Sequence, residues 1–342
     1  MNNIEQAESV LKGKKVLVTG ATGFTGGHVA RRLLAIGAQV TILARKTSNQ
    51  DTVNELAEKG ATIVFGDVTN RDSVFEAVKG QEYVFHIAAL FREAKHPDSR
   101  YFEVNRDGVI HVFDAAEEFG IRRVIHCSTI GVHSHIPNPP ASESEPYRPG
   151  DVYQESKCEG EKVALERMKK GKVEVSIIRP AMIWGDGDRR FVKLFKGVIR
   201  RRLPIIGSGK SLTHWIYFED LVDAFLLAAV RPEANGQVYI IAGRTIVPYE
   251  EVVKAIAKVA GVKPLLWKVP VSLVWVAGFL TELICRPLGI EPPLYRRRVD
   301  FFTKSRAFNT AKAQKELGFS PRYNFEEEVR RIYVSYQQSG LL

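Results

Sequence analysis

Short apolar runs alternate with stretches of helical periodicity over the first 180 residues. The run VLVTG at 16–20 is rich in β-branched residues and ends in glycine, which is typical of a buried strand in a parallel sheet. Similar runs predict strands at 40–43, 61–67, 83–90, 123–129 and 173–180. Apolar residues at helical spacing predict helices at 26–38, 51–59, 71–79, about 104–119 and 152–170. This alternation predicts an α/β fold with a doubly wound parallel sheet.

The alternation weakens beyond Pro180, where glycine and proline interrupt the apolar runs. The stretches 218–230 and 238–243 keep the periodicity of a helix and a strand, so they fit the same sheet. With 342 residues, the chain is long enough for about two domains. We expect one domain that contains the sheet and a smaller lobe that covers the substrate. Their predicted bounds are 13–184 plus about 212–244 for the first, and about 185–211 plus 245–342 for the second.

A glycine-rich loop joins the first predicted strand to the first predicted helix. Its glycines allow a tight turn and a close approach to a pyrophosphate, and the helix N-terminus supplies free N–H groups. The alternative is a tight turn without a ligand, but a strand before the loop and a helix after it favour phosphate binding. The predicted phosphate-loop residues are Gly20, Thr22, Gly23, Phe24, Thr25 and Gly26.

The spacing G-x-x-G-x-x-G in TGATGFTGGHVARRL resembles the extended short-chain dehydrogenase/reductases, the NAD-dependent epimerase/dehydratase superfamily. Further segments resemble that family in order, nearly throughout 14–330, and imply a Rossmann fold. By this resemblance, Asp67 and Val68 would hold the adenine, and Ala88 and Ala89 in HIAAL would line the nicotinamide ribose. Three further family positions are Asn105, which joins the catalytic set, and Pro180 and Ile183, which join the cofactor site.

The end of the second predicted strand bears on the choice of cofactor. An acidic residue there favours NAD, whereas an arginine accommodates the 2′-phosphate of NADP. This chain has Arg45 and Lys46 after Ala44 and no carboxylate, which favours NADP(H). NAD(H) stays open, because two solvated basic residues at a strand end give the same pattern and arginine also stacks on adenine.

Tyr153 and Lys157 are four residues apart on a predicted helix and therefore share one face. A tyrosine phenol is a weak base because its pKa is ordinarily ~10, and a nearby ammonium stabilises the phenolate. In the family that the chain resembles, this lysine also binds the nicotinamide ribose. Such a pair is often only a solvated helix face, but its place after the fifth strand favours catalysis. Thr129 is the expected catalytic hydroxyl, with Ser128 as the alternative.

The leading function is an NAD(P)-dependent dehydrogenase or reductase that acts on a hydrophobic alcohol or ketone. The sequence Pro-Pro-Leu with a following arginine triplet at 292–298 resembles the 3β-hydroxysteroid and sterol dehydrogenase branch, and dihydroflavonol reductases share the pattern. The arginine pair at 189–190 and the arginine triplet at 200–202 suit a diphosphate instead. A nucleotide-sugar epimerase or dehydratase with tightly bound NAD is therefore an alternative. A non-catalytic dinucleotide sensor is the alternative from another class.

The segment 269–284 is apolar on all sides of a helix and has basic neighbours. It predicts a lid over the substrate, a homodimer interface or a peripheral membrane contact. A net charge of +10 permits anionic partners without choosing among them, and we expect no nucleic-acid partner. Three scattered cysteines indicate a reducing compartment and no metal site. The expected location is the cytoplasm, with the membrane surface as a peripheral alternative.

Overall fold

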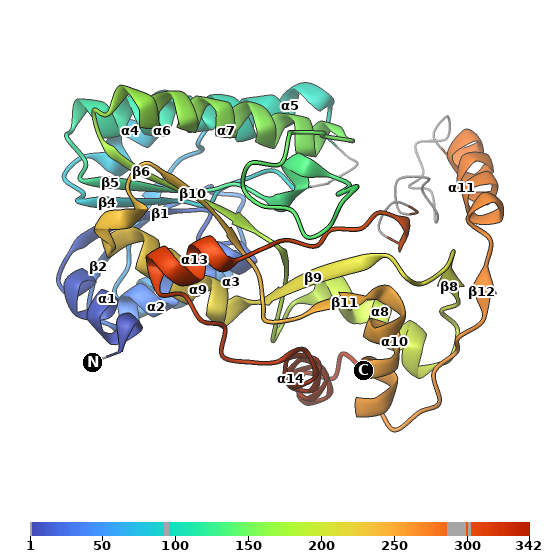
Figure 1. Cartoon of the computed structure of the whole chain (residues 1–342). Helices are drawn as coiled ribbons and strands as arrows, with labels where there is room; N and C mark the ends of the chain where they lie inside the picture. Colours follow the sequence, from blue (N-terminus) through green and yellow to red (C-terminus); the bar gives the residue numbers. More distant parts are fainter. Residues whose placement is uncertain (1, 92–95, 286–298, 300–301) are drawn as a thin grey trace.

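A seven-stranded parallel sheet forms the centre of the computed structural model, which describes residues 2–91, 96–285, 299 and 302–342 (Figure 1). The strand order β10-β6-β5-β4-β1-β2-β3 confirms the predicted doubly wound sheet. The strands are β1 (Lys15–Thr19), β2 (Gln39–Ala44), β3 (Thr62–Phe65), β4 (Tyr83–His86), β5 (Arg123–Cys127), β6 (Glu174–Pro180) and β10 (Gln237–Ile241). The apolar runs of the central strands are buried because helices cover both faces of the sheet.

Two helical layers enclose the sheet, one on each face (Figure 1). One layer contains α1 (Asn3–Leu11), α2 (Phe24–Ala35), α3 (Gln50–Glu58), α9 (Phe218–Val230) and α13 (Ala311–Leu317). The other contains α4 (Arg71–Val78), α5 (Asp98–Phe102), α6 (Gly108–Glu118) and α7 (Val152–Lys170). Each layer has its own apolar core against the sheet.

The helix predicted at about 104–119 is present, with a π-helical turn in its first part. A π-helical turn at Glu103–Asp107 lies between α5 and α6 and moves the start of the regular helix to Gly108. Helix α7 packs closely on this turn through Gly160, where a Cβ atom would lie 1.9 Å from the carbonyl oxygen of Asn105. The turn therefore fixes Asn105 between the sheet and α7.

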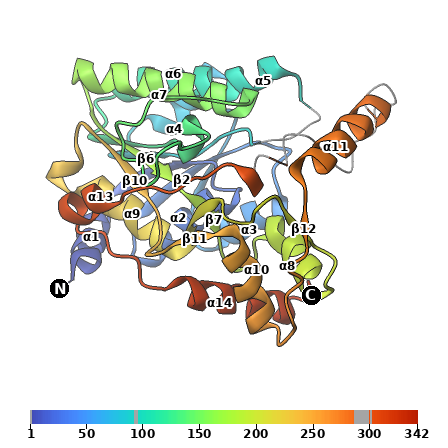
Figure 2. The ribbon, with the colours of Figure 1, turned by 45° about the vertical axis from the view of Figure 1, so that its right-hand side comes forward.

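The remaining elements pack beside the carboxyl ends of the sheet strands. A second sheet has the order β11-β9-β7, and β8 pairs with β12. These strands are β7 (Met182–Trp184), β8 (Ile205–Ile206), β9 (Leu212–Tyr217), β11 (Ile246–Pro248) and β12 (Lys268–Val269). The helices are α8 (Val192–Ile199), α10 (Tyr249–Val259), α11 (Val271–Cys285) and α14 (Phe325–Gln338). A third apolar core joins β7, β9, α8, α10 and α14, whereas α11 extends away from it (Figure 2).

Candidate active site

A cavity of about 1270 Å³ opens at the carboxyl ends of the sheet strands. This edge is where open parallel sheets bind ligands. The predicted site residues that line it are Gly20, Thr22, Gly23, Phe24, Thr25, Gly26, Arg45, Asp67, Val68, Ala88, Ala89, Ser128, Thr129, Tyr153, Lys157, Pro180 and Ile183. Two predicted residues do not line it: Asn105, and Lys46, which lies in an adjoining hollow.

The glycine loop has the geometry that a dinucleotide needs. Gly20 has a φ of +74°, and a Cβ atom there would lie 2.7 Å from the backbone nitrogen of Ala88. A Cβ atom on Gly26 would lie 2.3 Å from the Gly20 carbonyl oxygen. Helix α2 begins at Phe24, and no side chain caps its first N–H groups. The glycines therefore let the backbone approach a ligand closely, and the first N–H groups of α2 face the cavity. Both features suit a pyrophosphate.

Thr19, the last residue of β1 before the glycine loop, is hydrogen-bonded to the chain at the end of β4. Its Oγ1 accepts the N–H groups of Ile87 and Ala88, both at 3.2 Å, and lies 2.8 Å from His86 Nδ1. Burial, with the positive charge of Lys157 nearby, lowers the pKa of His86 to about 3, so this imidazole is neutral. The contact fixes the two chain segments that flank the cofactor position.

The cavity is basic at the exit of β2. Arg45 lines the cavity, and its backbone N–H donates to Ser48 Oγ at 3.2 Å. Asp67 is partly engaged, because Arg100 lies 3.1 Å from its carboxylate and Thr69 donates to it at 3.0 Å. Sequence reasoning did not identify Arg100, which comes from α5 and lies 33 residues away along the chain.

The two neighbouring hydroxyl groups after β5 have different partners. Ser128 Oγ donates to the carboxylate of Glu161, a fully buried side chain on α7. Thr129 Oγ1 accepts the backbone N–H of Gly131 at 3.0 Å and caps a short 3-10 helix at Ile130–His133. Because Thr129 only accepts in this bond, its hydroxyl group can still donate its proton to another acceptor.

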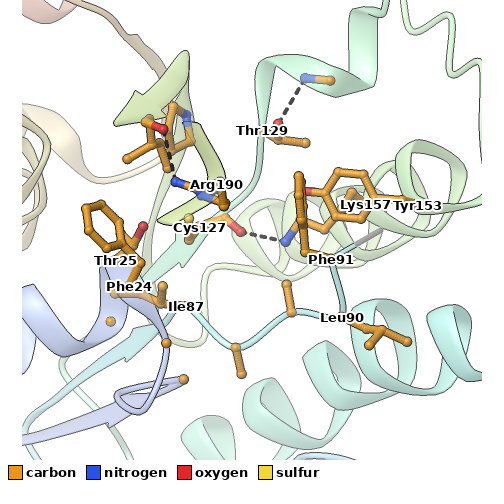
Figure 3. A pocket seen from close by; sticks show the side chains of 18 of the residues that line it. Phe24, Thr25, Ile87, Leu90, Phe91, Cys127, Thr129, Tyr153, Lys157 and Arg190 are labelled. Carbon is orange, nitrogen blue, oxygen red and sulfur yellow. Dashed lines mark hydrogen bonds between the residues drawn. The ribbon is translucent and has the colours of Figure 1, made fainter. Parts of the chain in front are cut away.

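Tyr153 and Lys157 lie on the first turns of α7, which Asp151 caps by accepting the N–H of Gln154 at 2.9 Å. The Tyr153 ring packs edge-on against Phe91, with centroids 5.0 Å apart. The Lys157 ammonium donates to the carbonyl oxygen of Cys127 at 2.7 Å, and burial lowers its pKa. Thr129, Tyr153 and Lys157 thus line the same cavity (Figure 3).

A buried charge cluster lies behind this end of the cavity. The Arg179 guanidinium forms an ion pair with Glu161, and the Tyr147 hydroxyl donates to Glu161 at 2.6 Å. Burial alone would raise the pKa of Glu161, but Arg179 and the hydrogen bonds from Ser128 and Tyr147 hold it below its usual value. Sequence reasoning missed this cluster, which joins β5, β6 and α7.

Asn105 acts on the backbone that borders the cavity. Its side chain accepts the N–H of Leu90 at 2.8 Å and donates to the Leu90 carbonyl oxygen at 3.1 Å. It also donates to Ser156 Oγ at 2.9 Å. Asn105 therefore connects the segment after β4 to α7. Its partner in that segment, Leu90, directly precedes Phe91.

Comparisons with known proteins show which family and which fold the chain resembles. Residues 16–242 match the NAD dependent epimerase/dehydratase family. The chain is 28% identical to 3beta-hydroxysteroid-dehydrogenase/decarboxylase isoform 1 of Arabidopsis thaliana, over 94% of this chain and 79% of the relative. It is 29% identical to 2-alkyl-3-oxoalkanoate reductase of Shewanella oneidensis, over 95% of this chain and 87% of the relative. A dTDP-glucose 4,6-dehydratase from Streptomyces venezuelae, with NAD and TYD bound, superposes with a TM-score of 0.74 at 22% identity, over 94% and 97%, and so shares the fold.

Proposed function

The chain belongs to the NAD dependent epimerase/dehydratase family and is an NAD(P)-dependent oxidoreductase; from this premise we propose that it transfers hydride between the nicotinamide and a lipophilic secondary alcohol or ketone. The observation that carries the proposal is the meeting of Thr129, Tyr153 and Lys157 beside the glycine loop in one cavity. The cofactor, when bound along the loop, supplies or accepts the hydride. Every proton in the reaction then has to be handled by the protein.

Tyr153 exchanges the proton of the substrate oxygen. In reduction its phenol donates a proton to the developing alkoxide, and in oxidation its phenolate accepts one. Thr129 donates a second hydrogen bond to the same oxygen and holds it beside Tyr153. The buried Lys157 ammonium stabilises the phenolate, and its bond to the Cys127 carbonyl fixes its position in the cavity.

The proposed cofactor is NADP(H). Arg45 lines the cavity at the exit of β2, Lys46 lies in the adjoining hollow, and no carboxylate occurs between Ala44 and Asp51. A guanidinium at this place suits a 2′-phosphate, whereas the 2′-hydroxyl of NAD usually meets a carboxylate.

The substrate side of the cavity supports a lipophilic molecule. Largely apolar side chains from β7, α8, α10, the loop before β8 and the C-terminal part of the chain form this wall. They are Met182, Leu194, Leu203, Tyr249 and Phe302. The names of the relatives given above describe a hydroxysteroid and an alkyl-substituted oxoalkanoate, which are lipophilic alcohols or ketones. Arg189 and Lys193 also line the cavity and favour a sugar nucleotide as the second candidate substrate.

The test of the activity is a spectrophotometric screen of NADPH oxidation and NADP reduction with steroid, terpenoid and long-chain oxo compounds and with sugar nucleotides. We expect turnover of a lipophilic substrate, and a loss of about 10²–10⁴-fold in Tyr153→Phe with cofactor affinity retained. Tyr333→Phe on α14, which does not line the cavity, is the control and should keep full activity. Turnover of sugar nucleotides alone, with NAD that co-purifies, would support the epimerase or dehydratase instead. Cofactor binding without any turnover would support a sensor.

The test of the cofactor is fluorescence titration of Arg45→Asp with NADPH and NADH. We expect the Kd for NADPH to rise at least about tenfold and the Kd for NADH to change little, because an anion replaces a cation beside the 2′-phosphate. Arg330→Asp, an exposed arginine on α14, controls for net charge. A wild-type protein that prefers NADH more than about tenfold would contradict the assignment of Arg45.

A further inference from the structure

Helix α11 has its apolar face directed outwards. Its exposed large apolar side chains are Leu273, Trp275, Val276, Phe279, Leu280, Leu283 and Ile284, which are 40–63% exposed. The buried positions of this helix are Gly278 and Glu282. A helix on the surface of a water-soluble domain normally has the reverse arrangement. The exposed residues therefore form a surface that is built for an apolar neighbour.

The exposed apolar surface continues from α11 onto the chain before it. Trp267 is 70% exposed and immediately precedes β12. Its carbonyl oxygen accepts the N–H of Ile205 at 2.9 Å, and Gly207 N–H donates to Val269 at the same distance. We define the lipid-facing surface as Trp267 together with the seven exposed apolar residues of α11.

Positive charge borders the lipid-facing surface. Arg200, Arg201 and Arg202 are exposed just before β8, which pairs with β12. Among the described residues, no carboxylate forms an ion pair with any of the three. Lys268 is exposed beside Trp267, with Glu250 at 3.3 Å from its ammonium. The only acidic residue of α11 is Glu282, which is buried.

We propose that the lipid-facing surface docks on an anionic lipid bilayer. Exposed tryptophan, leucine and phenylalanine side chains enter the boundary between headgroups and acyl chains, and arginines next to them bind anionic headgroups. The helix lies in the interface: none of the described helices is long and apolar enough to cross a bilayer, and the 15 residues of α11 span only about 22 Å.

A second copy of the chain fits this surface less well than a bilayer does. In a two-fold symmetric dimer, each surface meets the same surface of its partner. Both copies would then bring arginines 200–202 to the same interface, and this excess of positive charge would oppose the contact. Anionic headgroups neutralise the same charges. The charge beside the apolar side chains therefore favours lipid.

The lipid-facing surface adjoins the wall of the cavity. Leu203, which follows the arginine triplet directly, lines the cavity, and Ile205 two residues later pairs with the chain that leads into α11. One short stretch of chain thus borders both the lipid-facing surface and the substrate. If the proposed function holds, this arrangement lets a lipophilic substrate enter the cavity from the bilayer; the docking itself does not depend on that function.

Vesicle co-sedimentation tests the proposal without any substrate. The full chain is mixed with phosphatidylcholine vesicles, with or without phosphatidylglycerol, at low and high salt. We expect binding to the anionic vesicles that weakens with salt. Trp275→Glu/Phe279→Glu should abolish it, and Arg200→Ala/Arg202→Ala should weaken it by about fivefold for each arginine removed. Val10→Glu, an equally exposed apolar residue on α1, should bind as the wild type does.

Two further measurements keep the result unambiguous. Each variant must retain the NADPH affinity and the circular dichroism of the wild type, which shows that it is folded. Light scattering must give the same mass for the wild type and for Trp275→Glu/Phe279→Glu. The proposal is overturned if the wild type binds no anionic vesicle, or if it is a dimer that the double variant dissociates. Vesicle binding without turnover of any lipophilic substrate would reject the proposed function and leave the docking intact.

Discussion

Replacing Ser128 by alanine and Thr129 by valine separates two adjacent hydroxyl groups that the structure places in different surroundings. Ser128 Oγ donates to the buried carboxylate of Glu161, so it holds α7 against the end of β5. Thr129 lines the cavity, and we expect its hydroxyl group to donate to the substrate oxygen. The first substitution should therefore reduce stability, and the second should reduce turnover.

The magnitudes follow from these contacts. A hydrogen bond to a charged group contributes about 1.5–3 kcal/mol, and Ser128→Ala removes one from a fully buried carboxylate. With an unfolding entropy of roughly 2 cal/mol/K per residue, this loss lowers the Tm of the chain by about 2–4 °C. Thr129→Val removes a donor to the reacting oxygen, which costs about 10²–10³-fold in kcat. It also removes the cap of the 3-10 helix and about 1 kcal/mol of stability.

The assay combines thermal unfolding with steady-state turnover of the best substrate from the screen. Ser128→Ala should keep kcat within about threefold, because Oγ donates to Glu161 and we expect Thr129 to bind the substrate oxygen. Thr129→Ser is the matched control and should restore most of the activity that Thr129→Val loses. If Ser128→Ala loses turnover about 100-fold while Thr129→Val keeps it, the two roles are reversed and our reading of the cavity is refuted.

Two further predictions concern buried groups behind the site. Asn105→Ala removes three buried hydrogen bonds and should lower the free energy of unfolding, measured in urea, by about 2–4 kcal/mol. It should also raise the KM for the cofactor. Full stability with lost turnover would show that Asn105 acts in the chemistry instead. Glu161→Gln leaves Arg179 buried without its ion partner and should cost about 3–5 kcal/mol at pH 7. Because folding lowers the pKa of Glu161, the wild type loses this stability as the pH falls below about 4.5, and the variant should not. Equal stability of the wild type and Glu161→Gln at pH 7 would contradict the stabilising role of the ion pair.

The parts of the site that could be predicted from sequence are those that one turn or one helix contains. The glycine loop requires particular residues between a strand and a helix, and Tyr153 and Lys157 share a helix face by spacing alone. The strands follow from their apolar runs. These features need no knowledge of distant contacts, so local patterns were sufficient for them.

The different partners of Ser128 and Thr129 could not be predicted in the same way. Neighbouring residues at a strand end point to opposite sides, and the partner on each side depends on the elements packed there. Here Glu161, 33 residues further along the chain, binds the Ser128 hydroxyl. The π-helical turn at Glu103–Asp107 is likewise stabilised by a distant contact, that of Asn105 with Leu90.

The apolar segment at 269–284 was identified by sequence, but its orientation was not. A helix that is apolar on all sides gives no periodic signal of which face turns inwards. The structure shows that small and polar residues, such as Gly278 and Glu282, are the buried ones. The arginines at 296–298, which entered the sequence argument, lie outside the described residues.

Glu328 offers a test of the third core that is independent of catalysis. Its carboxyl group is buried and accepts the indole N–H of Trp184 at 2.7 Å, and burial raises its pKa to about 8. The folded protein therefore holds a proton that the unfolded chain has lost above about pH 4.5, so stability should fall as the pH rises from about 4.5 to 8. At about 1.4 kcal/mol per pKa unit, the total fall is roughly 3–5 kcal/mol.

Glu328→Gln should remove this dependence, because a neutral amide oxygen still accepts the Trp184 bond and carries no charge to bury. We expect urea midpoints of the variant to exceed those of the wild type at pH 9 and to be nearly equal at pH 5. Glu326→Gln, on the exposed face of the same helix, should follow the wild type at both pH values. A variant that is less stable than the wild type at pH 9 would mean that the Glu328 carboxylate is charged and favourable in the core, which its surroundings of Trp184, Trp215 and Phe325 argue against.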